Sequence, residues 1–496
     1  MTEQILSDLG FIGPEIALTA ALLAAILADL AFRRMAAPGG FIALAGLAVS
    51  ALLLAGRQGE QALLFGGMLA VDPFAWYFQL MVLVSAAAVV VFSMQSAELA
   101  PAARPMGEYY PLLLALTLGL MLMAGASNLL MMYLAMELSS LSSYVLAGYT
   151  REAPDSSEAS LKYLIYGAVA SGLMLYGASI LYGLTGSLGF QGVNSRLAEG
   201  GINTVPLLLA GLLVLAGLGY KISAVPFHSW TPDVYEGAPI AITAFLSVAS
   251  KAAGFALLIR FLKATFIDAG VAALPAGAWA TLSGFDWPTI LAVVSALTMT
   301  VGNLIAVWQN NMKRLLAYSS IAHAGTMLMG LVVLTGEGIA AVMVYMAVYL
   351  FMNLGAFYVV MRVADKTGSE DIEDYKGLGA RAPFLSVAFS VFLVSLTGLP
   401  PTAGFVGKLY VFAAAINGGW IWLAVVGALN GVIALYYYVR VMRNMYLRTG
   451  EGGSLSFGPL STGVVLALLV PTLLFGVYFS PLVNLAQSSA RLIGLP

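Results

Sequence analysis

The chain has 496 residues, of which 60% are hydrophobic and only 9% charged, and its mean hydropathy is +0.92. Ordinary soluble domains are about 45–50% apolar and about 25% charged, so this composition excludes a soluble globular protein. The net charge of −2 excludes a nucleic-acid binder, and the absence of cysteine excludes iron–sulfur ligation and disulfides.

Uninterrupted apolar blocks run through the whole chain. They are about 20 residues long, enough to cross about 30 Å of hydrocarbon, and they predict an all-α polytopic membrane protein with about fourteen transmembrane helices. The first block follows no basic region, so we expect it to be a mature span rather than a cleaved signal. The predicted helices cover residues 11–32, 41–56, 73–94, 109–125, 128–149, 158–183, 205–230, 239–262, 288–308, 315–335, 338–363, 384–416, 420–446 and 463–484.

Lys and Arg in the loops predict the orientation, because cytoplasmic loops carry their excess. Loops after odd-numbered helices hold thirteen such residues and the other side holds five. We therefore expect both termini to lie in the periplasm. The thirteen are Arg33, Arg34, Arg104, Arg151, Lys313, Arg314, Arg362, Lys366, Lys376, Arg381, Arg440, Arg443 and Arg448, and the five are Arg57, Arg196, Arg260, Lys263 and Arg491.

An internal repeat relates the sixth and eleventh helices. The matching stretch in each helix begins with a tyrosine, Tyr163 or Tyr345. It carries a second tyrosine thirteen residues later and leads into Thr-Gly-Ser. Two further matches are Ser139-Ser140 with Ser319-Ser320, and Pro226 with Pro401. We interpret helices 4–8 and 9–13 as two five-helix units, inverted because five is odd. Chance similarity among Leu-, Ala- and Gly-rich spans is the alternative.

The repeat divides the chain into four predicted parts. Three transmembrane helices occupy 1–108, the first five-helix unit 109–265, the second unit 285–448, and a C-terminal transmembrane helix 449–496. Breaks are predicted in the seventh helix at Pro226 and in the twelfth at Gly398-Leu399-Pro400-Pro401, since proline lacks a backbone donor. A broken helix in lipid needs protein or a watery cavity beside it.

Five ionisable residues lie near the centres of predicted helices: Glu137, Lys221, Lys251, His323 and Lys408. A Lys or Glu at mid-bilayer costs about 2.5–3.5 kcal/mol on the lenient scale, so four of them cost on the order of 10–14 kcal/mol. Such a cost indicates a function. The five residues are expected at similar depth, as a polar row in which a movable Glu–Lys pair switches a proton.

Structural alternatives are open for several of these residues. Glu137 with Lys221 could form a static ion pair, and Lys162 could extend its side chain to the interface. His323, taken alone, could be a satisfied core residue, and His228 could cap a helix or bond within a loop. Asp233 and Glu236 fall in a predicted loop, HSWTPDVYEGAP, which they would order.

The stretch from Gly219 to Arg260, GYKISAVPFHSWTPDVYEGAPIAITAFLSVASKAAGFALLIR, resembles the antiporter-like subunits of proton-pumping NADH:quinone oxidoreductase, respiratory complex I. The segment PFHSWTPDVYEGAP resembles the subunit N branch of that family. YLAMELSSLSSYVL and TGLPPTAGFVGKLYVF match the same family, so the resemblance covers essentially the whole chain. Lysine at 408 fits subunit N, whereas subunit M has glutamate there, and subunit L is extended by a lateral helix.

The resemblance implies a proton-translocating subunit of the bacterial inner membrane. It implies that Glu137, Lys221, Lys251 and Lys408 carry proton translocation, with His323, His228 and Lys162 as possible relays. It also implies that this chain holds no cofactor or metal, so that NADH, FMN, iron–sulfur clusters and quinone belong to partner subunits. The expected partners are other membrane-arm subunits, including sister antiporter-like subunits, together with the lipid bilayer and protons.

Two alternative functions are kept. The first is a subunit of a multi-subunit sodium/proton antiporter, which shares this fold and the buried lysines. The second is a non-transporting scaffold that seals and spaces the membrane arm. The electron donor of the parent complex is open, because related assemblies take electrons from ferredoxin, formate or hydrogenase modules.

Overall fold

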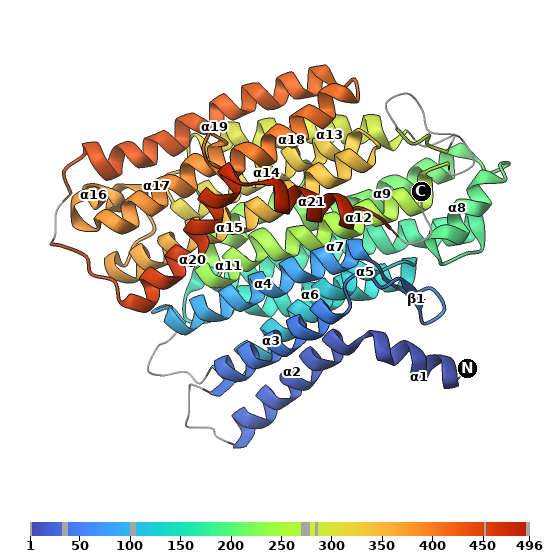
Figure 1. Cartoon of the computed structure of the whole chain (residues 1–496), viewed down its shortest axis with the longest axis horizontal. Coiled ribbons are helices and arrows are strands. Elements are labelled where there is room, and N and C mark those ends of the chain that lie inside the picture. Colours follow the sequence, from blue (N-terminus) through green and yellow to red (C-terminus); the bar gives the residue numbers. More distant parts are fainter. Residues whose placement is uncertain are drawn as a thin grey trace.

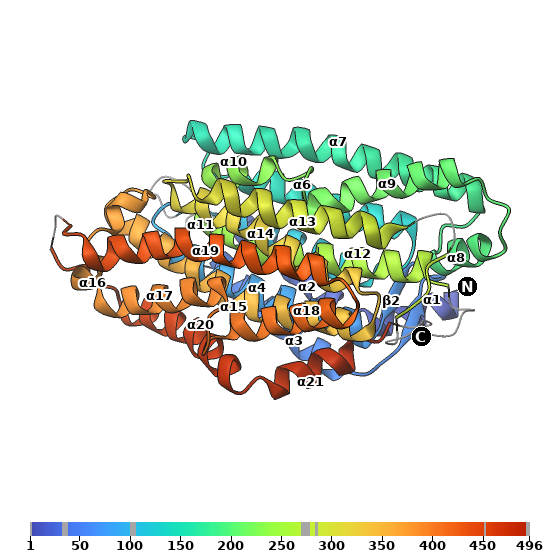
Figure 2. The same ribbon diagram turned by 90° about the horizontal axis from the view of Figure 1, so that it is seen from above.

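The structure, a computed structural model, describes residues 2–31, 38–99, 106–268, 278–282, 286–450 and 453–492. Its long helices run side by side along one common direction (Figures 1 and 2). Both ends of the described chain lie at the same end of this bundle, as an even number of spans requires (Figure 1). Three of the cations behind the predicted orientation, Arg33, Arg34 and Arg104, lie outside the described residues.

The N-terminal part forms one edge of the bundle (Figure 1). A hairpin of two short antiparallel strands interrupts it, with Phe65, Gly66 and Gly67 at positive φ in the turn. The prediction of an all-α chain missed this hairpin, because each strand has only three residues. The elements are α1 (Thr2–Phe11), α2 (Gly13–Ala31), α3 (Pro38–Gly56), β1 (Ala62–Leu64), β2 (Leu69–Val71) and α4 (Pro73–Gln95).

The first predicted five-helix unit contains five spans. Asn128 caps the second of them by accepting a hydrogen bond from the Met131 amide, and a π-helical turn, η1, lies directly before Lys251. The elements are α5 (Tyr109–Gly125), α6 (Leu129–Ala147), α7 (Pro154–Thr185), α8 (Phe190–Ala198), α9 (Thr204–Ile222), α10 (Trp230–Gly237), α11 (Ile240–Phe245), η1 (Leu246–Ser250) and α12 (Lys251–Phe266).

The second unit and the C-terminal span follow, with α19 along the edge of the bundle opposite α2 (Figure 1). Asn311 and Thr335 cap two of the helices through their side-chain oxygens. The elements are α13 (Trp287–Ala306), α14 (Met312–Val332), α15 (Gly336–Thr367), η3 (Ile372–Tyr375), α16 (Leu378–Arg381), α17 (Pro383–Thr397), α18 (Ala403–Asn417), α19 (Ile421–Leu447), α20 (Pro459–Val477) and α21 (Ser480–Ser489).

The described residues form fourteen spans, as predicted. Twelve helical segments are long and apolar enough to cross a membrane, and α5 is a shorter apolar helix of the same kind. The remaining span is the pair α17 and α18. The most apolar 18-residue window of Ile240–Phe266 is entirely buried inside the protein, whereas only 22% of the window in Pro459–Val477 is buried. The first of these segments therefore forms the centre of the bundle and the second lies at its surface.

Both predicted helix breaks are present. In the seventh span α9 ends at Ile222, Ser223 takes a left-handed φ of 62°, and the chain resumes as α10. In the twelfth, Gly398 takes a φ of 88° and α18 begins at Ala403. The prediction that Asp233 and Glu236 lie in a loop is wrong, because both belong to α10.

Candidate functional site

Lys221 lies at the C-terminal end of α9, just before the break. Only 2% of the residue is exposed, and its ammonium donates a hydrogen bond of 2.8 Å to the Ser139 hydroxyl on α6. The stem of the lysine packs against α12, since a Cβ built on Gly254 would lie 3.3 Å from Lys221 Cγ. The break in the seventh span therefore holds a buried cation against a hydroxyl group.

Glu137 lies on α6, two residues before Ser139, and its side chain is half-buried. The carboxylate interacts electrostatically with Lys221, but the two form no direct ion pair among the described residues. Its Oε1 atom is buried and has no hydrogen-bond partner within the described part of the chain. This arrangement is not the static ion pair considered from the sequence.

Lys251 begins α12, immediately after η1. Its ammonium donates to the Ser320 hydroxyl at 2.5 Å and to the Ser320 carbonyl at 2.8 Å, and only 2% of the residue is exposed. Ser320 lies on α14, in the second five-helix unit. Lys251 thus contacts the second unit directly from the buried centre of the first.

His323 lies one helical turn after Ser320. Its Nδ1 atom shares a hydrogen bond of 2.7 Å with the Tyr345 hydroxyl, and its Nε2 atom lies 3.5 Å from the Tyr438 hydroxyl. The imidazole interacts electrostatically with both Lys251 and Lys408. His323 is therefore close enough to interact with both lysines, and its role as a relay stays a prediction.

Lys408 lies on α18, directly after the break in the twelfth span. Its ammonium donates to two backbone carbonyls at the end of α17, that of Thr397 at 2.6 Å and that of Leu396 at 3.2 Å. These carbonyls are free to accept because the helix ends there. The Lys408 ammonium is thus held by carbonyls of the break itself, whereas Lys221 at the seventh-span break is held by the Ser139 hydroxyl of α6.

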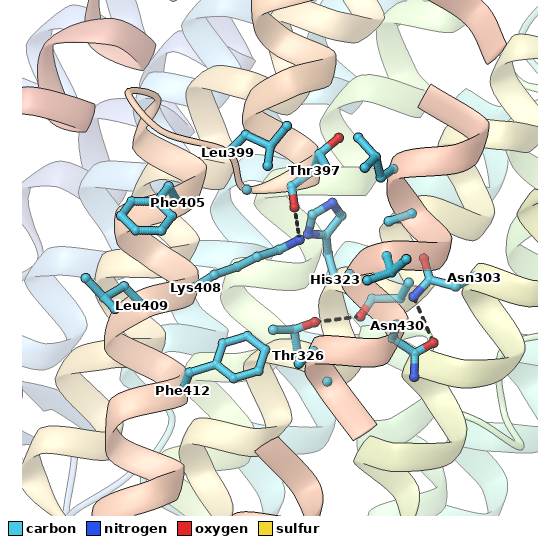
Figure 3. Close-up of a pocket in the computed structure, with 18 of the residues that line it drawn as sticks. Asn303, His323, Thr326, Thr397, Leu399, Phe405, Lys408, Leu409, Phe412 and Asn430 are labelled. Carbon is cyan, nitrogen blue, oxygen red and sulfur yellow. Dashed lines mark hydrogen bonds between the residues drawn. The ribbon is translucent and has the colours of Figure 1, made fainter. Parts of the chain in front are cut away.

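Lys408 also lines a cavity of about 370 Å³. Figure 3 shows the Lys408 ammonium beside the His323 ring, with Asn303 and Asn430 on the opposite wall. The Asn303 side-chain amide donates to the side-chain oxygen Oδ1 of Asn430 at 3.1 Å, and its own Oδ1 accepts from the Tyr437 hydroxyl at 3.0 Å. Polar groups and room for water thus meet at the last lysine of the predicted row.

Lys162 belongs to a cluster of charged side chains. Lys162 pairs with Glu158 at 2.7 Å and with Asp233 at 2.6 Å, and it is 37% exposed. Arg314 joins the same group through Asp233 and Glu236. We call these five residues, Lys162, Glu158, Asp233, Glu236 and Arg314, the charged rim.

His228 lies in the segment between α9 and α10. Its Nδ1 atom is buried and has no hydrogen-bond partner in the described part of the chain. Its role as a relay stays a prediction.

Reasoning from charged residues alone missed the hydroxyl groups. Ser139 and Ser320 accept hydrogen bonds from Lys221 and Lys251, and Tyr345 and Tyr438 flank His323. A signal existed, because the Ser-Ser pairs were one of the matches between the two units. In the described residues, no group of three or more His, Cys, Asp and Glu side chains could hold a metal ion.

Comparison with known proteins agrees with this geometry. The family model described as "NADH:quinone oxidoreductase/Mrp antiporter, TM" matches residues 126–434. NADH-quinone oxidoreductase subunit N 2 of Chloroherpeton thalassium is 50% identical over 437 residues, 87% of this chain and 84% of that protein. NADH-quinone oxidoreductase subunit N of Anaeromyxobacter sp. is 47% identical over 511 residues, 99% and 98% of the two chains.

Solved structures extend the comparison to the fold. A chain of respiratory complex I from Thermus thermophilus is 33% identical, with a TM-score of 0.78 over 96% of this chain and 99% of that one. A chain of the Mrp complex from Dietzia sp. has a TM-score of 0.80 over 99% and 97% of the chains at 21% identity, which is a likeness of fold alone. The chain belongs to the family of NADH-quinone oxidoreductase subunit N.

Proposed function

We propose that this chain is a proton-translocating membrane-arm subunit of NADH-quinone oxidoreductase. The observation that carries the proposal is a set of three lysines, each held by a neutral oxygen acceptor rather than by a carboxylate: the buried Lys221 and Lys251 and the partly buried Lys408. A lysine in such a site can lose its proton without leaving an unpaired anion beside it. A lysine whose purpose was structural would be paired and would stay charged.

Glu137 supplies the switch in this account. A carboxylate nearby favours the charged form of Lys221, and its withdrawal favours the neutral amine. Because Oε1 of Glu137 makes no hydrogen bond within the described chain, its side chain is free to turn towards Lys221 or towards a neighbouring subunit. A proton released by Lys221 would then pass along Lys251, His323 and Lys408.

The redox chemistry belongs to partner subunits in this proposal. NADH, FMN, the iron–sulfur clusters and quinone would be held by other chains, and this chain would act as a translocase without its own redox site. Sister antiporter-like subunits would adjoin it in the membrane arm. The protein would lie in the bacterial inner membrane with both termini in the periplasm, as the loop cations predict.

The two alternatives make different predictions. A sodium/proton antiporter subunit would make transport depend on sodium concentration, whereas proton pumping driven by NADH oxidation would proceed in its absence. A scaffold would leave pumping unchanged when a buried lysine is neutralised.

The test is Lys221→Ala in the assembled complex in sealed vesicles, with NADH:quinone turnover and proton uptake measured together. We expect at least a tenfold loss of pumping, which corresponds to about 1.4 kcal/mol or more. The control is Lys376→Ala, since Lys376 pairs with Glu373 in a surface segment. Unchanged protons per electron in Lys221→Ala would remove this lysine from the mechanism and favour the scaffold.

A further inference from the structure

The eighth span contains a π-helical turn directly before Lys251. This turn, η1 (Leu246–Ser250), is the only π-helical turn in the described part of the chain. A π-helical turn adds one residue to the helix, so the residues after it are rotated by roughly 100° around the helix axis relative to an uninterrupted α-helix. The turn therefore decides which neighbouring helix Lys251 faces.

The two halves of the eighth span are fixed on either side of this turn. Before it, the Thr243 hydroxyl donates to the Tyr235 carbonyl of α10 at 3.1 Å. After it, the Arg260 guanidinium donates to both carboxylate oxygens of Asp72, at 2.7 and 2.8 Å. The additional residue has to be accommodated between Thr243 and Arg260, but these two anchors do not determine in which turn of the helix.

A side chain of α15 holds the turn at its observed place. The Asn353 amide is fully buried and donates a hydrogen bond of 2.7 Å to the hydroxyl of Ser247, the second residue of η1. Ser247 in turn donates to the Ala244 carbonyl at 2.8 Å. Because its single hydroxyl hydrogen is used there, the Ser247 oxygen must be the acceptor for Asn353. The hydrogen bond thus fixes the side-chain amide of Asn353 as a donor to η1.

Packing alone does not explain an asparagine at this position. The Asn353 Oδ1 atom is buried and has no hydrogen-bond partner among the described residues. A buried amide oxygen without a partner is unfavourable, and an apolar side chain of similar size would avoid that cost. The hydrogen bond to Ser247 is therefore the contact of Asn353 that a leucine could not replace.

The same side of α15 carries the contacts to His323. Tyr345 shares a hydrogen bond of 2.7 Å with the imidazole, and the Tyr349 ring lies beside it with ring centroids 5.1 Å apart. Tyr345, Tyr349 and Asn353 follow one another at intervals of four residues, which places them along one side of the helix. One side of α15 thus holds both His323 and the turn that precedes Lys251.

We propose that Asn353 is a positioning residue for Lys251. By binding Ser247 it keeps the additional residue of the eighth span before position 251, so that the Lys251 ammonium reaches both oxygens of Ser320. Without this hydrogen bond the π-helical turn can shift to a later turn of the helix, which rotates Lys251 by roughly 100° away from Ser320. The inference rests on the proposed function, since Asn353 acts only through Lys251.

The test uses Asn353→Leu and Ser247→Ala in the assembled complex, because these variants remove the hydrogen bond from its two sides. NADH:quinone turnover and protons taken up per electron are measured in sealed vesicles. The matched control is Asn444→Leu, since Asn444 is also a buried asparagine but donates to the Ile372 carbonyl of η3.

We expect Asn353→Leu to lower coupled turnover roughly 5-fold and Ser247→Ala roughly 3-fold, sizes that correspond to the loss of one neutral hydrogen bond. Asn444→Leu should match the parent. A cryo-EM structure of the Asn353→Leu complex should show the π-helical turn shifted past position 251 and the Lys251 ammonium out of reach of Ser320. If Asn353→Leu does not assemble, Ser247→Ala decides by the same measurements.

A double variant separates positioning from a general loss of packing. If Asn353 acts through the contact between Lys251 and Ser320, adding Ser320→Ala to Asn353→Leu should lower turnover by less than about 2-fold further. Two independent effects would instead multiply, to roughly 15-fold or more below the parent. That result, or a Lys251 ammonium that still contacts Ser320 in Asn353→Leu, would overturn the positioning role.

Lys251→Ala on the same platform distinguishes this inference from the proposed function. If Lys251→Ala stops pumping while Asn353→Leu and Ser247→Ala match the parent, only the positioning role of Asn353 is wrong. If Lys251→Ala pumps normally, the proposed role of Lys251 and the positioning role are both wrong.

Discussion

The lysines of the two predicted five-helix units are held by different kinds of acceptor. Lys221 and Lys251 donate to the side-chain hydroxyls of Ser139 and Ser320, whereas Lys408 donates to the backbone carbonyls of Leu396 and Thr397. A hydroxyl can both accept and donate a proton, but a carbonyl can only accept a hydrogen bond. In the proposed mechanism, the first two lysines would therefore exchange protons through protein side chains.

Lys408 needs another path, and the cavity of about 370 Å³ beside it supplies one. A proton leaving its ammonium has His323 and the space along Asn303 and Asn430 to enter (Figure 3). In the proposed mechanism, proton transfer at Lys221 and Lys251 would depend on hydroxyl groups. Proton transfer at Lys408 would depend on the position of this lysine in the cavity. The following variants test the two halves of this comparison separately.

The largest effect is expected for Gly398→Ala. A Cβ at this position would lie 2.5 Å from Lys408 Cδ, so the lysine side chain must shift from the position in which it donates to the Thr397 carbonyl. We expect proton pumping to fall roughly 10-fold, measured as proton uptake in vesicles.

Gly368→Ala is the matched control for backbone strain. Gly368 has a similar φ of 72°, but a Cβ there would meet nothing within 4 Å. Both substitutions place alanine in the left-handed region, at a cost of about 1–3 kcal/mol. Equal pumping by the two variants would show that the position of Lys408 is unimportant.

A smaller effect is expected for Ser320→Ala. The substitution removes the hydroxyl that Lys251 contacts at 2.5 Å but leaves the Ser320 carbonyl at 2.8 Å. We expect coupled turnover to fall roughly 3- to 5-fold, which corresponds to about 0.6–1 kcal/mol for one lost hydrogen bond, and Ser320→Thr to restore most of it.

Thr397→Val is the companion variant at the other lysine. Lys408 contacts the backbone carbonyl of Thr397, while the Thr397 hydroxyl donates to Leu393. Because valine keeps this backbone carbonyl, turnover should stay within about 20% of the parent, a change that corresponds to less than about 0.2 kcal/mol. A loss in Thr397→Val as large as that in Ser320→Ala would contradict the distinction between hydroxyl and carbonyl acceptors.

The smallest effect concerns Glu98, in the loop after α4. Burial raises the pKa of the Glu98 carboxyl, although Lys313 and the Ile240 amide act in the opposite direction. A carboxyl whose pKa is raised on folding adds stability below its unfolded pKa, and this is lost as the pH rises through the folded pKa. Lys313 itself is held by the carboxylate of Glu370 at 2.7 Å, so this lysine has the paired, structural kind of site.

Glu98→Gln should remove the loss of stability that the Glu98 carboxyl causes as the pH rises. We expect the thermal midpoint of the assembled complex at pH 8 to rise by about 1–2 °C, with the difference from the parent shrinking towards pH 5. Thermal melts at several pH values would measure it. A midpoint that falls at pH 8 would mean that the carboxylate stabilises this loop as an anion.

Much of the fold follows from the sequence because hydrophobic length and proline position are local signals. The break in the twelfth span lies at residues 398–402, where Gly398 and the two prolines predicted it. The seventh span was harder. Its second half, α10, contains Pro232, Asp233 and Glu236, which are typical of a loop, but it is helical because buried Trp230, Val234 and Tyr235 pack into the core.

The site was predicted less completely than the fold. The lysines were predicted because a charged residue within an apolar helix is costly to bury, and a single such residue can be recognised in the sequence. The acceptors come from other helices, Ser139 from α6 and Ser320 from α14, and only tertiary packing shows which hydroxyl meets which lysine.

The most direct measurement of the central claim is proton uptake per electron in Lys221→Arg. Arginine keeps the positive charge and can still donate to Ser139, but it does not release a proton in proteins. If Lys221 is a proton carrier, the assembled variant should lose pumping at least tenfold, as Lys221→Ala does. If Lys221 serves only as a fixed positive charge, Lys221→Arg would pump normally, and that result would contradict the account.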